Sequence, residues 1–210
     1  MANLAECAIA IAKEDLDKTD GAIRKAQDGE KSQMVYKRIY KNKDTNDTYT
    51  LYEEYNDNMW HPSKLVLKKG LATITVAEGE DCDYAKLDDE LRGKGYHLDK
   101  SENIRNITVC DGYRIDWIKL NTYSYDYTPY VSEYEDHITV FFGGRWDFPS
   151  SLEDKLYEMG VRWQGAGCED GMDWQFDDGG NWDFGLRIGS ETEYCDGEPY
   201  QQHYVYDESK

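Results

Sequence analysis

The stretch "DHITVFFGGRWDFPSSLEDKLYEMGVRW" (residues 136–163) contains the patterns of a strand, a helix and a second strand, in that order. Its ITVFF run is β-branched or aromatic throughout, which favours a strand. Pro149 is followed by two serines and two acids, a composition typical of a helix N-terminus, so we predict that Ser150 or Ser151 caps the helix. Gly160 lies where helices commonly end in a left-handed conformation.

The same order of patterns recurs earlier in the chain. The stretch "ATITVAEGEDCDYAKLDDELRGKGYHL" (residues 72–98) repeats the ITV triplet and is followed by a comparable helical pattern. After one inserted residue, the aligned positions are Leu87 with Leu152, Leu91 with Leu156, Gly95 with Gly160, and Leu98 with Trp163. This self-similarity indicates an internal repeat.

Each copy is followed by an alternating stretch with a turn in the middle. Residues 106–120 turn at Asp111-Gly112, and residues 173–188 turn at the Asp-Gly-Gly of 178–180, so both are predicted hairpins. We therefore predict an α+β fold of antiparallel sheets with helices on one face, built from two ferredoxin-like strand–helix–strand–strand repeats. The predicted repeats are residues 71–120 and 137–188.

Residues 1–70 precede these repeats and form a separate segment in this interpretation, ahead of an acidic domain at 71–210. The opening "NLAECAIAIAKEDLDKTDG" fits both a helical stripe and the alternation of a strand, and we favour a helix that ends near Gly21. The following "MVYKRIYKNKDTNDTYTLYEEYND" alternates on both sides of a polar turn, which predicts a hairpin over residues 34–57.

The second repeat, residues 137–188, resembles the ferredoxin-like domain of the YubB type, which occurs in phage and plasmid proteins of unassigned role. The matching features are the first strand, Trp146 and Pro149, the helix and strand that follow, a Gly-Met-Asp triplet and the closing Gly-Asn hairpin. Phe148 stands where the family usually has the first of two prolines, and "NLAEC" stands near the N-terminus where the family usually has Trp-Cys-Asn. The resemblance implies a mobile-element origin and no known chemistry.

Charge is distributed unevenly along the chain. The 24 basic and 43 acidic residues give a net charge of −19. Residues 1–70 contain 12 of each sign, so the entire excess lies in residues 71–210. An acidic surface cannot bind nucleic acid through bulk electrostatics, because contacts to phosphate require Lys and Arg. Solubility would explain some of this excess, but a local excess points to a basic partner.

The segment "NTYSYDYTPYVSEYEDH" (residues 121–137) combines tyrosines with carboxylates and contains no Lys or Arg. Its alternation fits an edge strand whose tyrosines fill a core, and it also fits a surface for a cationic partner. The acidic "EDGMDWQFDDGG" that follows lacks the EF-hand spacing, so we interpret it as a solvated hairpin end. The candidate partner-binding residues are Tyr125, Asp126, Tyr127, Glu133, Glu135, Asp136, Glu169, Asp170, Asp173, Asp177, Asp178 and Asp183.

Motifs for catalysis or cofactor binding are absent from the sequence. There is no P-loop, G-x-S-x-G or G-x-G-x-x-G, and the four histidines have no metal-ligand spacing. We therefore predict no enzyme activity, no cofactor and no metal. The five cysteines form no CxxC pair and follow no signal-peptide pattern, which indicates reduced thiols in a bacterial host cytoplasm. No apolar run is long enough to span a membrane.

Three functions remain compatible with the sequence. The favoured one is a non-catalytic acidic inhibitor from a phage or mobile element, of the anti-CRISPR or antirestriction type. It would mimic nucleic acid and occupy the basic nucleic-acid-binding groove of a host defence protein or complex, without binding nucleic acid itself. The first alternative is an acidic adaptor or structural module that binds a basic protein or forms a homo-oligomer through residues 1–70. The second is a metal-dependent protein with an unrecognised site.

Overall fold

The computed structural model describes residues 4–56, 61–122, 129–145, 148–169, 175–195 and 198–208. Strands account for 57% of it and helices for 17%, and the strands form three antiparallel sheets. The predicted α+β fold with helices on one face and ferredoxin-like repeats is therefore wrong. The chain divides into two compact units, Met1–Asp28 with Thr108–Lys210 (unit 1) and Gly29–Ile107 (unit 2). The expected boundary at residue 70 lies inside unit 2.

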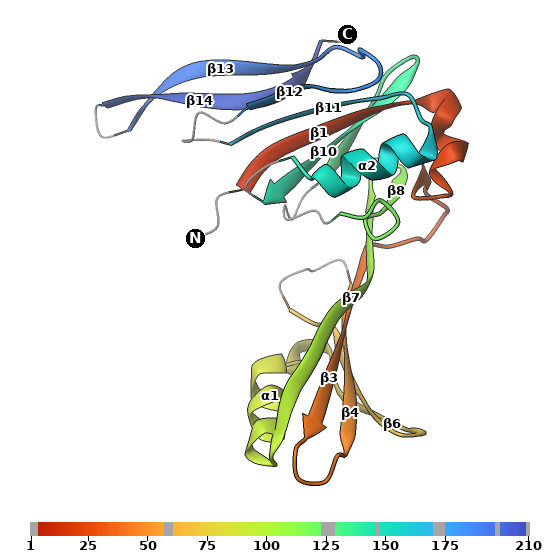
Figure 1. Cartoon of the computed structure of the whole chain (residues 1–210), viewed down its shortest axis with the longest axis vertical. Helices are drawn as coiled ribbons and strands as arrows, with labels where there is room; N and C mark the ends of the chain where they lie inside the picture. Colours follow the sequence, from red (N-terminus) through yellow and green to blue (C-terminus); the bar gives the residue numbers. More distant parts are fainter. Residues whose placement is uncertain are drawn as a thin grey trace. The chain divides into compact units, whose positions relative to one another are not determined.

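Unit 1 is organised around a five-stranded sheet whose central strand comes from the start of the chain (Figure 1). The order is β12-β11-β1-β10-β9. Residue Ile9 of the central strand pairs with Val140 on one side and Gly165 on the other. The bounds are β1 Leu4–Ala12, β9 Tyr130–Glu133, β10 His137–Arg145, β11 Trp163–Glu169 and β12 Gln175–Gly180.

The predicted N-terminal helix is therefore a strand, followed by the 3₁₀-helix η1, Lys13–Thr19. The reason lies in burial on both faces. Cys7, Ile9 and Ile11 enter one core, while the alternate alanines enter a second core on the opposite face of the sheet. A strand covered on both sides needs apolar residues at every position, and such a run cannot be distinguished from a buried helix by periodicity.

Helix α2, Ser150–Met159, covers one face of this sheet (Figure 1). Its buried Leu152 and Leu156 pack in the same core as Trp163 and Trp117. The C-cap at Gly160 has φ 65°, which confirms the predicted left-handed helix end. The expected serine cap is wrong, because Pro149 occupies the N-cap position without a side-chain hydrogen bond.

A two-stranded ribbon belongs to the other face of the sheet. It consists of β13, Leu186–Cys195, and β14, Glu198–Asp207. The core beneath it contains small residues of the sheet together with Phe184, Leu186 and Val205 of the C-terminal segment. Strand β12 pairs with β11, and β13 pairs with β14, so the predicted hairpin over residues 173–188 is wrong.

The remaining strands of unit 1 are β2, Ile23–Lys25, and β8, Tyr113–Asp116, which pair antiparallel. Strand β7, Tyr96–Cys110, ends in unit 1 and leads through a two-residue turn into β8. Asp111 and Gly112 in this turn have φ 48° and 77°. Both values lie in the left-handed region that a type I′ turn requires, and the hairpin predicted here is confirmed.

Unit 2 contains five consecutive strands, β7-β3-β4-β5-β6, of the seven-stranded sheet whose full order is β2-β8-β7-β3-β4-β5-β6, and helix α1 covers them. Leu87 and Leu91 of α1 pack against Tyr40, Leu51 and Leu65 of the sheet. The predicted hairpin over residues 34–57 is confirmed as β3 and β4. The remaining bounds are β3 Gln33–Asn42, β4 Thr48–Asn56, β5 Lys64–Lys69, β6 Ala72–Glu78, η2 Gly79–Asp81 and α1 Tyr84–Gly93.

The two predicted repeats share an order of elements but not an arrangement in space. Both β6-α1-β7 and β10-α2-β11 read as strand, helix, strand. In unit 1, β10 and β11 flank the inserted strand β1, whereas in unit 2, β6 and β7 are separated by three other strands. Similar local sequence has therefore produced two different sheets.

Candidate functional site

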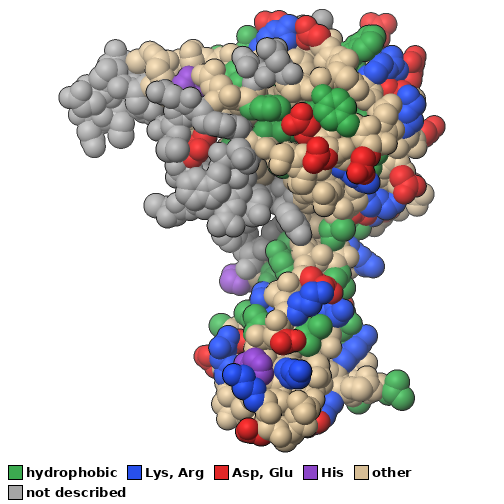
Figure 2. Space-filling model, viewed as in Figure 1, with side chains coloured by type: hydrophobic (Ala, Val, Ile, Leu, Met, Phe, Trp, Pro, Cys, Tyr) green, Lys and Arg blue, Asp and Glu red, His purple; other side chains and the backbone are tan. Residues whose placement is uncertain are grey.

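The negative charge is concentrated in unit 1. Unit 2 contains 13 basic and 15 acidic residues, a net charge of −2, while unit 1 contains 11 basic and 28 acidic residues, a net charge of −17. Figure 2 shows Lys and Arg side chains spread over the visible face of unit 2, the lower body in that view. The sequence predicted that the acidic domain begins at residue 71. In the structure, the acidic unit also includes the N-terminal residues up to Asp28.

Glu133, a candidate partner-binding residue, is neutralised inside unit 1. Its carboxylate accepts from Lys25 Nζ at 2.5 Å and forms an ion pair with Lys13 at 3.1 Å. The bond from Lys25, together with that from Lys13, lowers the pKa of Glu133 to about 2. Lys25 also lies 4.0 Å from the centre of the Tyr113 ring. Glu133 therefore connects β9 to the N-terminal segment and offers little free charge to a partner.

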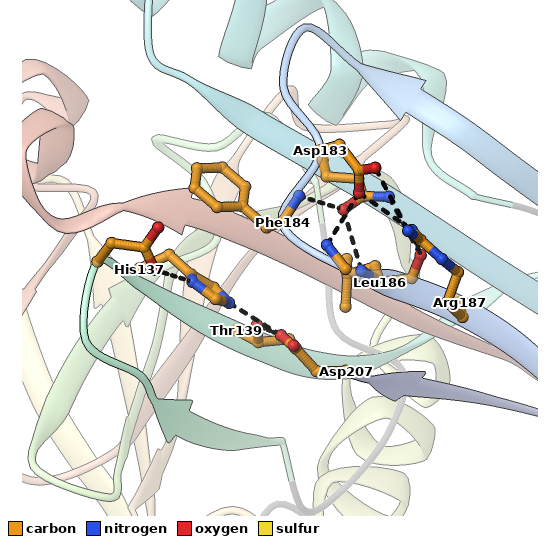
Figure 3. A network of polar contacts seen from close by, with 10 residues as sticks. His137, Thr139, Asp183, Phe184, Leu186, Arg187 and Asp207 are labelled. Carbon is orange, nitrogen blue, oxygen red and sulfur yellow. Dashed lines mark hydrogen bonds and ion pairs between the residues drawn. The ribbon is translucent and has the colours of Figure 1, made fainter. Parts of the chain in front are cut away.

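Asp136, a second candidate, belongs to a polar network around the buried His137 (Figure 3). Asp136 Oδ1 lies 2.7 Å from Nδ1 of the imidazole, and Asp207 Oδ2 lies 3.0 Å from Nε2. Thr139 Oγ1 donates to the same Asp207 oxygen at 2.5 Å. The hydrogen bond with His137 lowers the pKa of Asp136.

Aromatic rings enclose this imidazole on both sides. The rings of Tyr134 and Phe184 stack on His137 with centroid distances of 4.7 and 4.8 Å. His137 is 1% exposed, so no substrate can reach it from solvent. Because Asp207 ends β14 while His137 begins β10, the network attaches the C-terminal ribbon to the sheet. The network therefore stabilises the attachment of the ribbon.

The loop that carries Phe184 is itself held by the sheet. The Gln164 side chain accepts from the backbone N–H groups of Phe184, at 2.7 Å, and Leu186, at 3.0 Å, and donates to the Leu186 carbonyl at 3.1 Å. Asp183, another candidate residue, pairs with Arg187 at 3.0 Å (Figure 3). The hydrogen bond from Arg187 lowers the pKa of Asp183. Asp183 thus closes a local turn and is also neutralised.

Glu169 was expected on a solvated hairpin and is instead 1% exposed, at the end of β11. Its Oε1 has no hydrogen-bond partner in the described part of the chain. Glu135 is exposed, and its backbone carbonyl accepts from Lys13 Nζ at 3.4 Å. Asp177 and Asp178 lie on β12, but their side chains are outside the description. The candidates outside the described residues are Tyr125, Asp126, Tyr127, Asp170 and Asp173.

A cavity of about 630 Å³ lies in unit 1 between the end of η1, the turn after β8 and α2. Asp20 and Asn121 line it with positive φ angles of 51° and 55°. Lys119 Nζ donates to the Asp20 carbonyl at 2.6 Å, and Lys155 pairs with Glu158 at 2.8 Å. The lining combines both signs of charge with apolar groups.

Cysteine chemistry is also disfavoured. Cys7, Cys82, Cys110 and Cys168 are thiols. Burial raises the pKa of the Cys110 thiol to about 11, and burial is also the largest cause that raises the pKa of Cys82. A nucleophilic cysteine needs the opposite shift, because the thiolate is the reactive form. These two thiols therefore have the properties of core residues.

Unit 2 contains its own buried ion pair. Glu53 is fully buried in β4, and its carboxylate accepts from Arg38 Nε and, at 3.3 Å, from Arg38 Nη2. Tyr55 Oη donates to Glu53 Oε2 at 3.1 Å. Arg38 also lies over the Tyr84 ring at 4.3 Å, which links α1 to the sheet. The pair is enclosed by its own sheet and helix, so it acts within the fold.

Among the described residues, no group of three or more His, Cys, Asp and Glu side chains is arranged to hold a metal ion. No helix in the described ranges is long and apolar enough to cross a bilayer. Comparison with family models, curated proteins and solved structures finds no match to this chain. The resemblance to the YubB-type domain therefore stays a prediction.

Sequence reasoning missed the His137–Asp207 contact and the ion pairs of Glu133. The partners are separated by 70 and 108 residues, and neither pair has a recognisable spacing. The one sequence signal for these ion pairs was the presence of isolated lysines, such as Lys13 and Lys25, in a unit that is otherwise rich in acids.

Proposed function

We propose that unit 1 is a non-catalytic acidic binding body that occupies the basic nucleic-acid-binding surface of another protein and competes with nucleic acid there. The observation that carries this proposal is the net charge of −17 on a unit that comprises both ends of the chain. Self-repulsion of this size destabilises a compact state, and a basic partner would offset it. In this proposal, the protein is a phage or plasmid product that inhibits a host defence protein.

Internal ion pairs decide which acids are available to a partner. Glu133 and Asp183 are paired with Lys and Arg side chains of unit 1, and Asp136 is hydrogen-bonded to His137, so these three acids offer less to a partner. Other carboxylates are exposed and have no cation partner within the described ranges. These are Asp17, Asp20, Asp28, Glu135, Asp154 and Glu191.

Three of these acids come from neighbouring elements. Asp17 belongs to η1, Asp20 follows it, and Asp154 lies on α2, which contacts η1. Asp20 and Asp154 line the same cavity. This region therefore replaces residues 133–136 as the first place to test, because reversal of its charges breaks no internal ion pair of the described structure.

The first experiment is a pull-down from bacterial lysate at low salt with the tagged protein, eluted by a salt gradient or by duplex DNA. The expected result is a nucleic-acid-binding protein that competing DNA displaces, because ion pairing is screened by salt and shared with phosphate. Recovery of a partner that duplex DNA does not displace would contradict competition with nucleic acid.

The second experiment compares two triple variants of equal charge change. Asp17, Asp20 and Asp154 are changed to Lys in unit 1, and the exposed Asp89, Glu90 and Asp99 are changed to Lys in unit 2. We expect the unit 1 variant to weaken binding about tenfold or more, since each exposed charge pair contributes about 0.2–1 kcal/mol and reversal adds repulsion. Equal losses in the two variants would place the interface elsewhere.

A further inference from the structure

Strand β6 is the outer strand of its sheet (Figure 1), and its apolar side chains are exposed. Ile74 is 62% exposed and Val76 is 43% exposed, while Leu71 in the turn before the strand is 105% exposed. Every residue from Ala72 to Val76 is exposed. One edge of β6 therefore has backbone groups without a neighbouring strand among the described elements, bordered by uncovered apolar groups.

The strands at the two sides of unit 2 differ in how they are protected. Strand β7 has β8 as a further neighbour in the sheet and also carries Asp99, Lys100 and Glu102, and charged side chains on an edge oppose pairing with another chain. Strand β6 has no charged residue between Leu71 and Ala77. A bulge at Val76, where the register with β5 shifts, is its single irregularity. An uncharged edge of this kind is suited to addition of a further strand.

We propose that β6 pairs with β6 of a second copy of this chain, antiparallel, so that the two unit 2 sheets become continuous. Charge supports this partner. A strand without charged residues offers nothing to a basic or acidic peptide, whereas β6 itself is apolar and neutral. Unit 2 has a net charge of −2, so two copies can approach through it without the repulsion that unit 1 would impose.

The charges that border the strand select the antiparallel orientation. Glu78 ends β6 and keeps a 69% exposed side chain, with Lys64 of its own chain 3.8 Å away. Lys68 and Lys69 close the other end of the hairpin on β5, where Lys69 also pairs with Asp47 at 3.0 Å. An antiparallel pair places the Glu78 end of each copy beside the lysine-bearing end of the other, whereas a parallel pair would place Glu78 beside Glu78. Opposite charges across an interface favour one arrangement and like charges oppose the other.

Pairing would also extend an existing core. Ile74 lies directly opposite Leu67 of β5, and Leu67 packs against the core cluster that contains Leu65 and Leu51. A strand added at β6 would cover Ile74 and continue this apolar layer across the interface. One strand pair buries less than the roughly 800 Å² per partner of a standard interface, so the dimer is expected to be weak and concentration-dependent.

Sedimentation velocity over a concentration series up to about 500 µM, in buffer of high ionic strength, tests the proposal. The wild-type chain should shift towards a dimer as its concentration rises. Ile74→Lys, at an exposed position that leaves the fold intact, should raise the dimer dissociation constant at least tenfold, because it places a charge at the pairing edge. Val76→Lys, at the bulge, provides a second variant with the same expectation.

Ile104→Lys is the matched control, because Ile104 is 44% exposed on β7, at the other side of unit 2. It should dimerise as the wild type does. A wild-type chain that stays monomeric throughout the series would overturn the proposal, as would equal dimerisation of wild type and Ile74→Lys. Loss of the dimer in Ile104→Lys would move the interface to β7. The measurement uses no partner protein, so it is independent of the proposed function.

Discussion

Asp15 and Asp17, two residues apart in η1, have carboxylates in opposite environments. Asp15 is 3% exposed, and its Oδ2 accepts from both the backbone N–H and Nε of Arg162, each at 2.9 Å. Lys18 adds an ion pair at 2.7 Å. These contacts, led by the side-chain bond from Arg162, hold the pKa of Asp15 well below its ordinary value of 3.8. Asp17 is exposed and takes part in none of them.

Asp15→Asn should lower the free energy of unfolding at pH 7 by about 2 kcal/mol, because hydrogen bonds to charged groups contribute about 1.5–3 kcal/mol. A depressed pKa adds stability that is fully present above the unfolded value of 3.8 and is lost as pH falls through the folded value. The difference in the free energy of unfolding between wild type and Asp15→Asn should therefore narrow below pH 3.8. Urea unfolding at several pH values measures it.

Asp17→Asn is the matched control, because it removes the same charge from the same 3₁₀-helix at an exposed position. Its effect should stay within about 0.5 kcal/mol, as is usual for surface substitutions. Equal destabilisation by the two variants would mean that overall charge, and not the bond to Arg162, determines the result.

At the scale of elements, the C-terminal ribbon is attached to the sheet by a few buried contacts. The Asp207 side chain is fully buried; it accepts from Thr139 and is hydrogen-bonded to His137, both of β10. Phe184 and Val205 supply the apolar part of the same attachment. Because the ribbon pairs only with itself among the described strands, these side chains set its local stability.

Asp207→Ala should loosen the ribbon without unfolding the sheet. The alanine offers no acceptor to Thr139 and no partner to His137, and a buried polar group left unsatisfied costs about 1–3 kcal/mol. Hydrogen exchange of β13 and β14 should accelerate about 5- to 150-fold, while β1 and β11 keep the wild-type rate. Asp183→Ala, at a side chain that is 70% exposed, should change exchange only a few-fold. Uniform acceleration in both sheets would argue against a separate ribbon attachment.

At the scale of the whole molecule, an acidic unit and a nearly neutral unit share one chain. Unit 2 is an insertion between Asp28 and Thr108 of unit 1. The net charges of −17 and −2 mean that repulsion between like charges acts mainly in unit 1. Salt screens such repulsion, because the Debye length falls from about 20–30 Å near 0.01–0.02 M to a few Å near 0.5 M.

Raising NaCl from about 20 mM to about 500 mM should therefore raise the unfolding temperature of unit 1 by about 2–4 °C. Tryptophan fluorescence follows this unit, because five of the six tryptophans lie in it. Hydrogen exchange of β3 and β4 reports unit 2, which should respond less. A midpoint that stays constant or falls with salt would show that the ion pairs of unit 1 outweigh its repulsion.

Patterns confined to short stretches predicted local structure well. The turns at Asp111-Gly112 and Gly160, the hairpin of β3 and β4, and the order strand–helix–strand in both predicted repeats all agree with the structure. Each depends on residues within a few positions of one another, such as a glycine with positive φ or alternation around a polar turn. The concentration of acidic residues is likewise a property of composition.

The assembly of these elements followed from contacts that no local pattern contains. Strand β1 lies between β10 and β11, and its two buried faces made it resemble a helix. Asp15 and Arg162, 147 residues apart, become partners, and Glu133 loses its free charge to Lys25, 108 residues away. The order of the strands and the choice of ion-pair partners depend on which segments pack against each other. The free energy of that packing comes from residues that are distant in the chain. The amino-acid order alone therefore specified turns, elements and total charge, while folding in three dimensions selected the neighbours of each strand and the acids that remain exposed.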